Sequence, residues 1–260
     1  MKCMVKNLSV MVLFLGVSSS LLAQKDAENY KKTLDIWKND IWNWNKPEFK
    51  VKDIPAEYAN LSSVVLARHN EIIADSKGKT KMIGLGFAVY KEMYVSNILR
   101  ESIKLNDKSA LADYSEISYV KLQKRVGPIS EAVDATYLGI RLIKPDGKVS
   151  EINAEDFVTI KDTKSRKEAK VAIPDLQVGD IIDYFIVKQY KLVGTDNSRE
   201  EVFNHMFSFY DDMPVLNYSV HIELGRKYAV EYRAYNGAPE FKVSSNDAED
   251  IVLDVAKKNI

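Results

Sequence analysis

Cysteine is almost absent from this chain of 260 residues, in which Cys3 is the only one. It precedes the apolar stretch at the start of the chain, where neither a catalytic thiol nor the thiol of a bacterial lipid anchor is placed. Once that start is removed, the mature chain contains no cysteine, which excludes disulfides, thiolate nucleophiles and zinc sites with cysteine ligands. Such a fold depends on its hydrophobic core for stability.

Long apolar runs are also missing, except for one at the start. Lys2 and Lys6 precede an apolar core from Val10 to Val17, and a serine-rich stretch leads to a cleavage point before Gln24. This pattern predicts a signal peptide over residues 1–23, so we expect the protein to be exported to the periplasm or outside the cell. An uncleaved anchor is the alternative, although the apolar core is short for a permanent membrane helix. No later stretch is apolar and long enough, so we expect no stable membrane span after cleavage.

A surplus of either charge is missing as well. The chain has 37 Lys and Arg against 37 Asp and Glu. Loss of the signal peptide removes Lys2 and Lys6 and no acidic residue, which leaves the mature chain slightly acidic. This balance excludes a nucleic-acid partner, and no long basic run indicates an anionic membrane.

An amphipathic helix is predicted over residues 24–46. Its apolar and aromatic residues recur at three- and four-residue steps, and they are Tyr30, Leu34, Trp37, Ile41 and Trp44. Lys46 and Pro47 end the pattern. We interpret this segment as a helix that docks on the domain behind it, and the alternative is a ligand platform or partner surface. The weak ligand-binding candidates on it are Trp37, Trp42 and Trp44.

A β domain is predicted over residues 47–260, because alternation with a period of two begins near Ser62 and continues. Residues 83–95 are expected to form one long strand, and Pro145-Asp146-Gly147 predicts a hairpin turn. Residues 181–187 are apolar on both faces, which is typical of a buried central strand. The predicted fold is mainly β, an antiparallel β-sandwich or open barrel with an N-terminal amphipathic helix.

The end of the chain carries the clearest alternation. Residues 216–224 alternate strictly, and after a turn at Gly225 and Arg226 a second strand is expected over residues 228–234. Residues 247–259 fit a short helix or a strand about equally well.

Candidates for chemistry are few. His69, His205 and His221 are the only histidines. His221 and Glu223 share a strand face, and we prefer a solvated polar face to a metal pair there. His205 lies among aromatic residues near Asp211, where it could line a pocket, although a half-buried structural histidine is the preferred interpretation.

Sequence motifs for catalysis and cofactor binding are also missing. No serine lies in a nucleophile elbow, and no glycine-rich phosphate loop or calcium loop is present. The sequence therefore predicts no catalytic residue, no metal and no cofactor, and a protein that is not an enzyme. His205 remains a weak ligand-binding candidate.

Five segments, taken in order, resemble a known family. They are residues 58–66, Tyr114-Ser115-Glu116-Ile117, Pro145-Asp146-Gly147-Lys148, residues 173–184 and Met213-Pro214-Val215. Together they cover most of residues 58–255 and resemble the domain of unknown function 3857, which lies N-terminal to transglutaminase-like domains in bacterial envelope proteins. The resemblance implies a β domain that is followed, in relatives, by a domain with a Cys-His-Asp triad. This chain has no counterpart of the triad, so we expect a fragment, a truncated gene product or the front module alone.

The leading hypothesis is an exported, noncatalytic β-sandwich module that positions, shields or supplies substrate contacts to a transglutaminase-like domain downstream. The substrates of such a partner would be peptides or protein amides. The alternative is a free-standing domain that binds a glycan or peptide with an aromatic face or a sheet edge. A third hypothesis is a hydrolase with an unrecognised site near His205.

Overall fold

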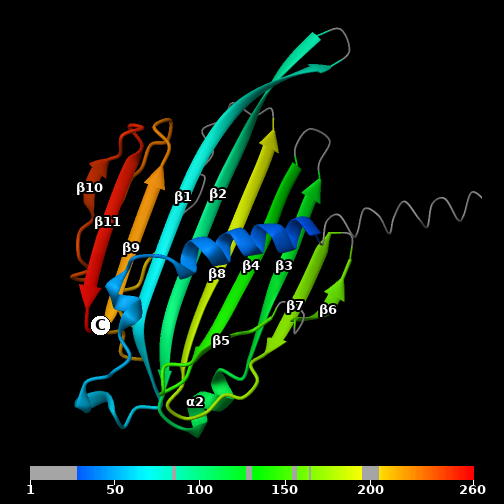
Figure 1. Ribbon diagram of the computed structural model, residues 1–260. Helices are drawn as coiled ribbons and strands as arrows, with labels where there is room; N and C mark the ends of the chain where they lie inside the picture. Colours follow the sequence, from blue (N-terminus) through cyan, green and yellow to red (C-terminus); the bar gives the residue numbers. More distant parts are fainter. Residues whose placement is uncertain (1–27, 84–85, 127–130, 154–156, 164, 195–204) are drawn as a thin grey trace, which may run out of the picture. The chain divides into compact units, whose positions relative to one another are not determined.

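The computed structural model describes residues 28–83, 86–126, 131–153, 157–163, 165–194 and 205–260 (Figure 1). The predicted signal peptide, residues 1–23, lies outside the described residues. The chain divides into two compact units, Met1–Trp44 and Asn45–Ile260.

The described part of the first unit is a helix over residues 28–42, which confirms the predicted N-terminal helix. The helix ends four residues before the predicted end, at a tight last turn. There the amide of Trp44 donates to the carbonyl of Ile41, and the Asn43 side chain bonds back to the carbonyl of Asn39 at 2.6 Å. Asparagine competes in this way with helical backbone bonds, which explains the early end.

The second unit is mainly β, as predicted. Its helical segments are η1 (Pro47–Lys50), η2 (Ala56–Tyr58) and α2 (Lys108–Asp113). Its strands are β1 (Ser63–Ile83), β2 (Gly86–Leu105), β3 (Glu116–Val126), β4 (Glu131–Ile143), β5 (Val149–Glu151), β6 (Phe157–Asp162), β7 (Arg166–Ala172), β8 (Ile181–Gly194), β9 (Asn217–Leu224), β10 (Lys242–Ser245) and β11 (Ile251–Lys258).

These strands form one open sheet of eleven strands in the order β10-β11-β9-β1-β2-β8-β4-β3-β7-β6, with β5 paired to β4 (Figure 1). Within the described residues there is no second sheet of the kind that a sandwich requires. The sheet is mixed, because β9 runs parallel to β1. A parallel pair requires a long connection. The chain supplies one between β8 and β9, which brings β9 to the far side of the β1–β2 hairpin.

The central strand and the hairpin turn are confirmed. β8 lies between β2 and β4 in the sheet, and Ile182, Phe185 and Val187 on it are 0% exposed. The turn at Gly147, which has a φ of 89°, joins β4 to β5. Glycine adopts this left-handed backbone without the steric cost that a side chain adds.

Two of the strand predictions are wrong. Residues 83–95 do not form one strand, since Ile83 ends β1 and pairs with Gly86 at the start of β2. Residues 228–234 form no strand either, although β9 before them alternates as predicted. Both edges of β9 are already occupied, one by β1 and the other by β11. The chain after β9 therefore finds no free edge and lays Tyr228 and Val230 against the core instead.

The hydrophobic core lies on one side of the sheet, which we call face A. Strands β1, β2, β4, β8, β9 and β11 contribute to it, and partly buried aromatic side chains from residues 205–241 pack against it. The opposite side, face B, carries a smaller cluster made of Val64, Leu66, Ile143, Ile181 and Leu216, with Ile54 and Tyr58 packed against it. Both faces of the central strands are thus buried.

Gly139 on β4 allows a close aromatic contact on face B. It pairs directly with Phe185 on β8, and a Cβ atom added at Gly139 would overlap the Phe185 ring. We expect Gly139→Ala to lower the free energy of unfolding by about 1–3 kcal/mol through this overpacking. Urea unfolding measures the loss, and Gly78→Ala is the matched control because a Cβ there has no heavy atom within 4 Å. Equal stabilities of the two variants would contradict the prediction.

Candidate functional site

Two pairs of neighbouring polar residues lie at the centre of the sheet. Arg100 and Glu101 are adjacent on β2, and Asp183 and Tyr184 are adjacent on β8. Neighbouring residues of a strand point to opposite faces. Each strand therefore sends one polar side chain to face A and one to face B, and each side chain meets a partner from the other strand.

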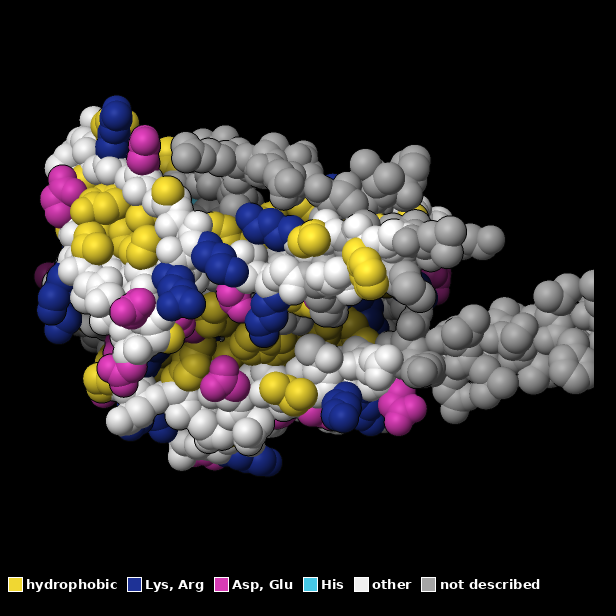
Figure 2. All heavy atoms as spheres, turned by 90° about the horizontal axis from the view of Figure 1, so that it is seen from above, with side chains coloured by type: hydrophobic (Ala, Val, Ile, Leu, Met, Phe, Trp, Pro, Cys, Tyr) yellow, Lys and Arg dark blue, Asp and Glu magenta, His cyan; other side chains and the backbone are white. Residues whose placement is uncertain are grey.

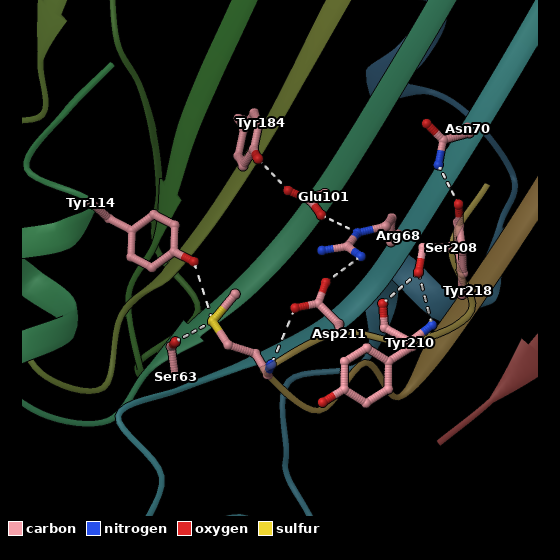
Figure 3. A network of polar contacts seen from close by, with 11 residues as sticks. Ser63, Arg68, Asn70, Glu101, Tyr114, Tyr184, Ser208, Tyr210, Asp211 and Tyr218 are labelled. Atoms are coloured by element: carbon pink, nitrogen blue, oxygen red, sulfur yellow. Dashed lines mark hydrogen bonds and ion pairs between the residues drawn. The ribbon is translucent and has the colours of Figure 1, made fainter. Parts of the chain in front are cut away.

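On face A these side chains form a group that we call the Arg68 clasp, which consists of Arg68, Glu101, Tyr184 and Asp211 (Figure 3). The Arg68 guanidinium lies between two carboxylates. Its Nε donates to Glu101, and its Nη1 donates to Asp211 Oδ2 at 2.6 Å. The Tyr184 hydroxyl donates to the other oxygen of Glu101. The clasp thereby joins β1, β2 and β8 to the segment that leads into β9.

The electrostatics of the clasp shift the pKa values of Arg68, Tyr184 and Asp211. Burial alone would lower the pKa of Arg68, but the charge of Glu101 and the hydrogen bonds to both carboxylates outweigh it and raise that pKa. Burial raises the pKa of Tyr184, and the Glu101 charge raises it further. Burial would raise the pKa of Asp211, but its bonds from Arg68 and the Met213 amide lower it. Tyr184 is thus a hydrogen-bond donor, and Asp211 is an anion held in place.

A second layer of contacts surrounds the clasp (Figure 3). The Ser63 hydroxyl donates to the sulfur of Met213 at 2.9 Å, and the Tyr114 hydroxyl does so at 3.6 Å. Asn70 donates to the Tyr218 hydroxyl at 3.0 Å. Burial raises the pKa of Tyr218 to about 12. These contacts attach residues 211–218 to β1 and to the end of α2.

On face B the polar side chains form an ion triad of Arg100, Asp183 and Arg141. Arg100 binds Asp183 with two nitrogens at 3.1 and 3.0 Å, and Arg141 binds the Oδ2 of the same carboxylate at 2.9 and 2.7 Å. The Asp183 side chain is 0% exposed and that of Arg100 is 2% exposed. The Phe49 ring of η1 covers the Arg100 guanidinium, with 4.1 Å from Cζ to the ring centroid. The triad ties β2, β8 and β4 together and holds η1 on the sheet.

The loop before β8 is held in place by hydrogen bonds of Gly179 and Asp180. Gly179 has a φ of 94°, and its amide donates to the Leu105 carbonyl at 2.7 Å. Asp180 is 1% exposed and accepts from the Lys144 ammonium at 2.7 Å and from the Gln177 amide at 2.8 Å. The Gly179-Asp180 pair in the segment that resembles the family thus fixes the point at which β8 enters the sheet.

A third polar cluster joins β1, β9 and β11. His69 is buried, and its Nδ1 lies 2.7 Å from the Ser219 hydroxyl while its Nε2 lies 3.3 Å from Glu71. His221 contacts Asp254 at 2.7 Å and lies 3.9 Å from Glu223, so the expected shared face of His221 and Glu223 is confirmed. Among the described residues, no group of three or more His, Cys, Asp or Glu could hold a metal ion.

His69 gives the stability of the protein a pH dependence, because burial lowers its pKa below the ordinary 6.5. The folded state then binds fewer protons than the unfolded state near that pH. The contribution of His69 is therefore complete above pH 6.5 and is lost as the pH falls toward the lowered pKa. We expect wild type to lose up to about 1.4 kcal/mol per pH unit through this group, and His69→Gln to show a smaller slope. Thermal unfolding between pH 7 and pH 5 measures both slopes, and equal slopes would contradict the prediction.

The sequence candidates for ligand binding do not come together in one site. Trp37, Trp42 and Trp44 belong to the first unit, and all three are half-buried rather than fully exposed. His205 belongs to the second unit and is exposed, with its Nε2 at 2.6 Å from the Asn97 amide nitrogen. The preferred interpretation of His205 as half-buried is therefore wrong. Of its aromatic neighbours, Phe207 and Phe209 pack against face A, whereas Tyr210 is exposed.

Helices that could cross a membrane are not found in the part of the chain that the structure describes, since none is both long and apolar enough.

Comparison with known proteins gives a family and a related fold. The family model of a domain of unknown function with solved structure, DUF3857, matches residues 95–259. One similar solved structure is described as a "putative protease" from Parabacteroides distasonis, with 14% identity and a TM-score of 0.49. The match covers 76% of this chain and 36% of that one, so the chain spans about a third of its length. No curated protein matches this chain.

The chain is thus a mainly β protein with an open, mixed sheet whose centre is tied together by ion networks. It belongs to the DUF3857 family. The matched residues begin inside β2 and omit β1, although β1 lies at the centre of the sheet and supplies Arg68. The folded unit therefore begins well before residue 95.

Proposed function

We propose that this chain is an exported, noncatalytic β module that positions a transglutaminase-like enzyme domain encoded after it. Family membership supports the proposal, because the sequence resembles the domain that precedes such enzymes. The signal peptide predicted over residues 1–23 supports export.

The main support for a noncatalytic role is that the carboxylates at the centre of the sheet are already bound by arginines. Glu101 and Asp211 are both bound by Arg68, and Asp183 is bound by two arginines from other strands. A general acid or base has to reach a substrate and exchange a proton with it. These carboxylates instead hold strands and a covering segment in place, which is the role of a scaffold.

The attachment of Ile260 to the sheet supports the proposal that the module positions a following domain. The amide of Ile260 donates to the Val215 carbonyl at 3.1 Å, and the Val215 amide donates to the Ile260 carbonyl at 2.9 Å. Val215 also bridges to Val65 at the start of β1. A domain that continues the chain after Ile260 would start from a residue that packs against the core and is held by two backbone hydrogen bonds. This attachment would give the two domains a fixed relative orientation, which a flexible linker does not.

The experiment compares three proteins: residues 24–260 alone, the downstream domain alone, and the two joined as the gene encodes them. Incorporation of a fluorescent primary amine into a glutamine peptide measures transamidation. We expect no incorporation by residues 24–260, and a kcat/KM at least about tenfold higher for the joined protein than for the enzyme domain alone, as positioning contributes by this order. Activity of residues 24–260, equal rates with and without them, or a downstream reading frame without the triad would refute the proposal.

A second candidate function, peptide binding at a sheet edge, is favoured by β6. This strand is the last of the sheet, and Val158 and Ile160 on it are 63% and 55% exposed. An open edge can accept a peptide as an additional strand. Backbone amide shifts confined to β6 on titration with a library-selected extended peptide would support this function, and shifts elsewhere would contradict it.

A further inference from the structure

Strands β1 and β2 continue beyond their neighbours as a two-stranded arm, which consists of residues 75–83 and 86–90 (Figure 1). Strand β9 pairs with β1 only from Arg68 to Ala74, and β8 pairs with β2 only from Lys91 to Lys104. Beyond these points the two strands pair only with each other. A two-stranded ribbon without a third strand is marginally stable in water, so the arm calls for a physical explanation.

The end of the arm is apolar. Residues 82–89 read Met-Ile-Gly-Leu-Gly-Phe-Ala-Val, without a polar side chain, although Gly84 and Leu85 lie outside the described residues. Phe87 is 77% exposed and Val89 is 68% exposed, and both lie on the same face of β2. An exposed group of large apolar side chains at a projecting end is typical of a surface that contacts a partner or a membrane.

Lysines flank this apolar end on both strands. Lys77, Lys79 and Lys81 lie on β1, Lys91 lies on β2, and no acidic residue occurs between Ser76 and Lys91. The backbone register places Gly78 opposite Lys91 and Lys81 opposite Ala88, so both strands have lysine positions next to the apolar residues. The Lys77 side chain is 70% exposed, with its ammonium 3.9 Å from Asp75. Figure 2 looks from above, the direction in which the arm points in Figure 1, and there hydrophobic, basic and acidic side chains are interspersed.

We propose that the arm inserts its apolar end into the head-group layer of a membrane that contains anionic lipid. Four residues of each strand reach about 13 Å at ~3.3 Å per residue. This length is sufficient for an apolar end to enter the outer ~5–10 Å of a bilayer. The lysines behind it then lie at the level of the lipid phosphates, where each contributes to binding. The arm carries Lys77, Lys79 and Lys81 against one acidic residue, Asp75, and this positive excess favours an anionic lipid surface over a second copy of this nearly neutral chain.

Vesicle binding by residues 24–260 tests the proposal, with the apolar signal peptide left out because it would bind lipid by itself. The absence of cysteine after Cys3 makes single-site labelling possible. Val89→Cys and Val158→Cys, two exposed valines on different parts of the sheet, each carry an environment-sensitive nitrobenzoxadiazole label. With vesicles of phosphatidylglycerol and phosphatidylcholine we expect a blue-shifted, brighter emission from position 89 and no change at position 158. An unchanged emission at position 89, or equal changes at both, would overturn the proposal.

Affinity measurements on unlabelled protein add a second test. We expect Phe87→Ser with Val89→Ser to weaken vesicle binding at least about tenfold. Lys77→Gln and Lys91→Gln should each weaken it about fivefold. The matched control, Val158→Ser with Ile160→Ser on β6, should bind as wild type, and thermal unfolding checks that all variants are folded. The proposal would be refuted if Phe87→Ser with Val89→Ser left vesicle binding unchanged. It would also be refuted if wild type did not bind vesicles but formed a soluble dimer that these two changes dissociate. The test does not depend on the enzyme partner, so either proposal can fail while the other stands.

Discussion

Replacing Asp183 by alanine is expected to lower the free energy of unfolding by about 3–5 kcal/mol. The carboxylate is fully buried at the centre of the sheet and is bound by two arginines from the strands on either side. Its removal takes away the carboxylate that both Arg100, which is buried, and Arg141 bind, and it leaves two positive charges close together. Urea unfolding followed by circular dichroism measures the loss, with the slope of the transition as the check that both proteins unfold in two states.

The control for this prediction is an ion pair with the same chemistry on the surface. Arg125 and Asp134 lie 3.0 Å apart, with side chains 57% and 36% exposed. An exposed pair of this kind contributes only about 0–1 kcal/mol, so Asp134→Ala should be nearly silent. Asp183→Asn keeps the shape of the side chain and removes its charge. We expect its loss of unfolding free energy to lie between those of Asp183→Ala and Asp134→Ala. Should Asp183→Ala cost no more than Asp134→Ala, the triad would not be the tie between strands that the geometry indicates.

Local patterns predicted much of the sheet. The apolar residues on both faces of residues 181–187 identify β8 as central, because a strand covered on both sides requires them. The Pro145-Asp146-Gly147 turn and the alternation of β9 are likewise properties of a few neighbouring residues. The end of the chain shows the same logic, since the strand alternative for residues 247–259 is the one that forms β11.

Long-range pairing explains the rest of the fold. Alternation alone does not show where a strand ends. The β1–β2 hairpin could not be recognised from the sequence, because the period of two continues through the turn at which Ile83 pairs with Gly86. Residues 228–234 have the pattern of a strand but lack a free sheet edge, since β11 takes the edge that a hairpin partner would use. Which strand occupies an edge depends on all the strands together.

The polar networks could not be predicted for the same reason. Arg68 and Glu101 lie 33 residues apart in the chain, and Arg68 and Asp211 lie 143 apart. Only the order of the strands brings them together. A signal was present in hindsight, because a charged residue inside an apolar strand, such as Asp183, has to be paired when it is buried. The sequence therefore indicates that partners exist but not which residues they are.

The second large effect is expected for Arg68→Met, which should lower the free energy of unfolding by about 3 kcal/mol. Methionine keeps much of the apolar volume of the arginine but removes the cation between Glu101 and Asp211. Glu101 is 7% exposed and would lose its positive partner in a buried place. Asp211 would lose its tie to β1, so the segment that leads into β9 should open more readily. Hydrogen exchange is expected to increase at the amides of Met213 and Val215, because the first bonds to Asp211 and the second to the Ile260 carbonyl.

Two further variants separate the ion network from simple packing. Arg125→Met makes the same chemical change in an exposed ion pair and should cost no more than about 1 kcal/mol. Arg68→Met combined with Glu101→Gln should recover part of the loss, because the carboxylate left without a cation is replaced by a neutral amide that Tyr184 can still bind. A double variant whose loss equals the sum of the two single losses, or unchanged exchange at Met213, would mean that the clasp does not hold the segment. Because this segment also fixes Val215 and through it Ile260, the same variant tests whether Ile260 is held rigidly, as the proposed positioning role requires.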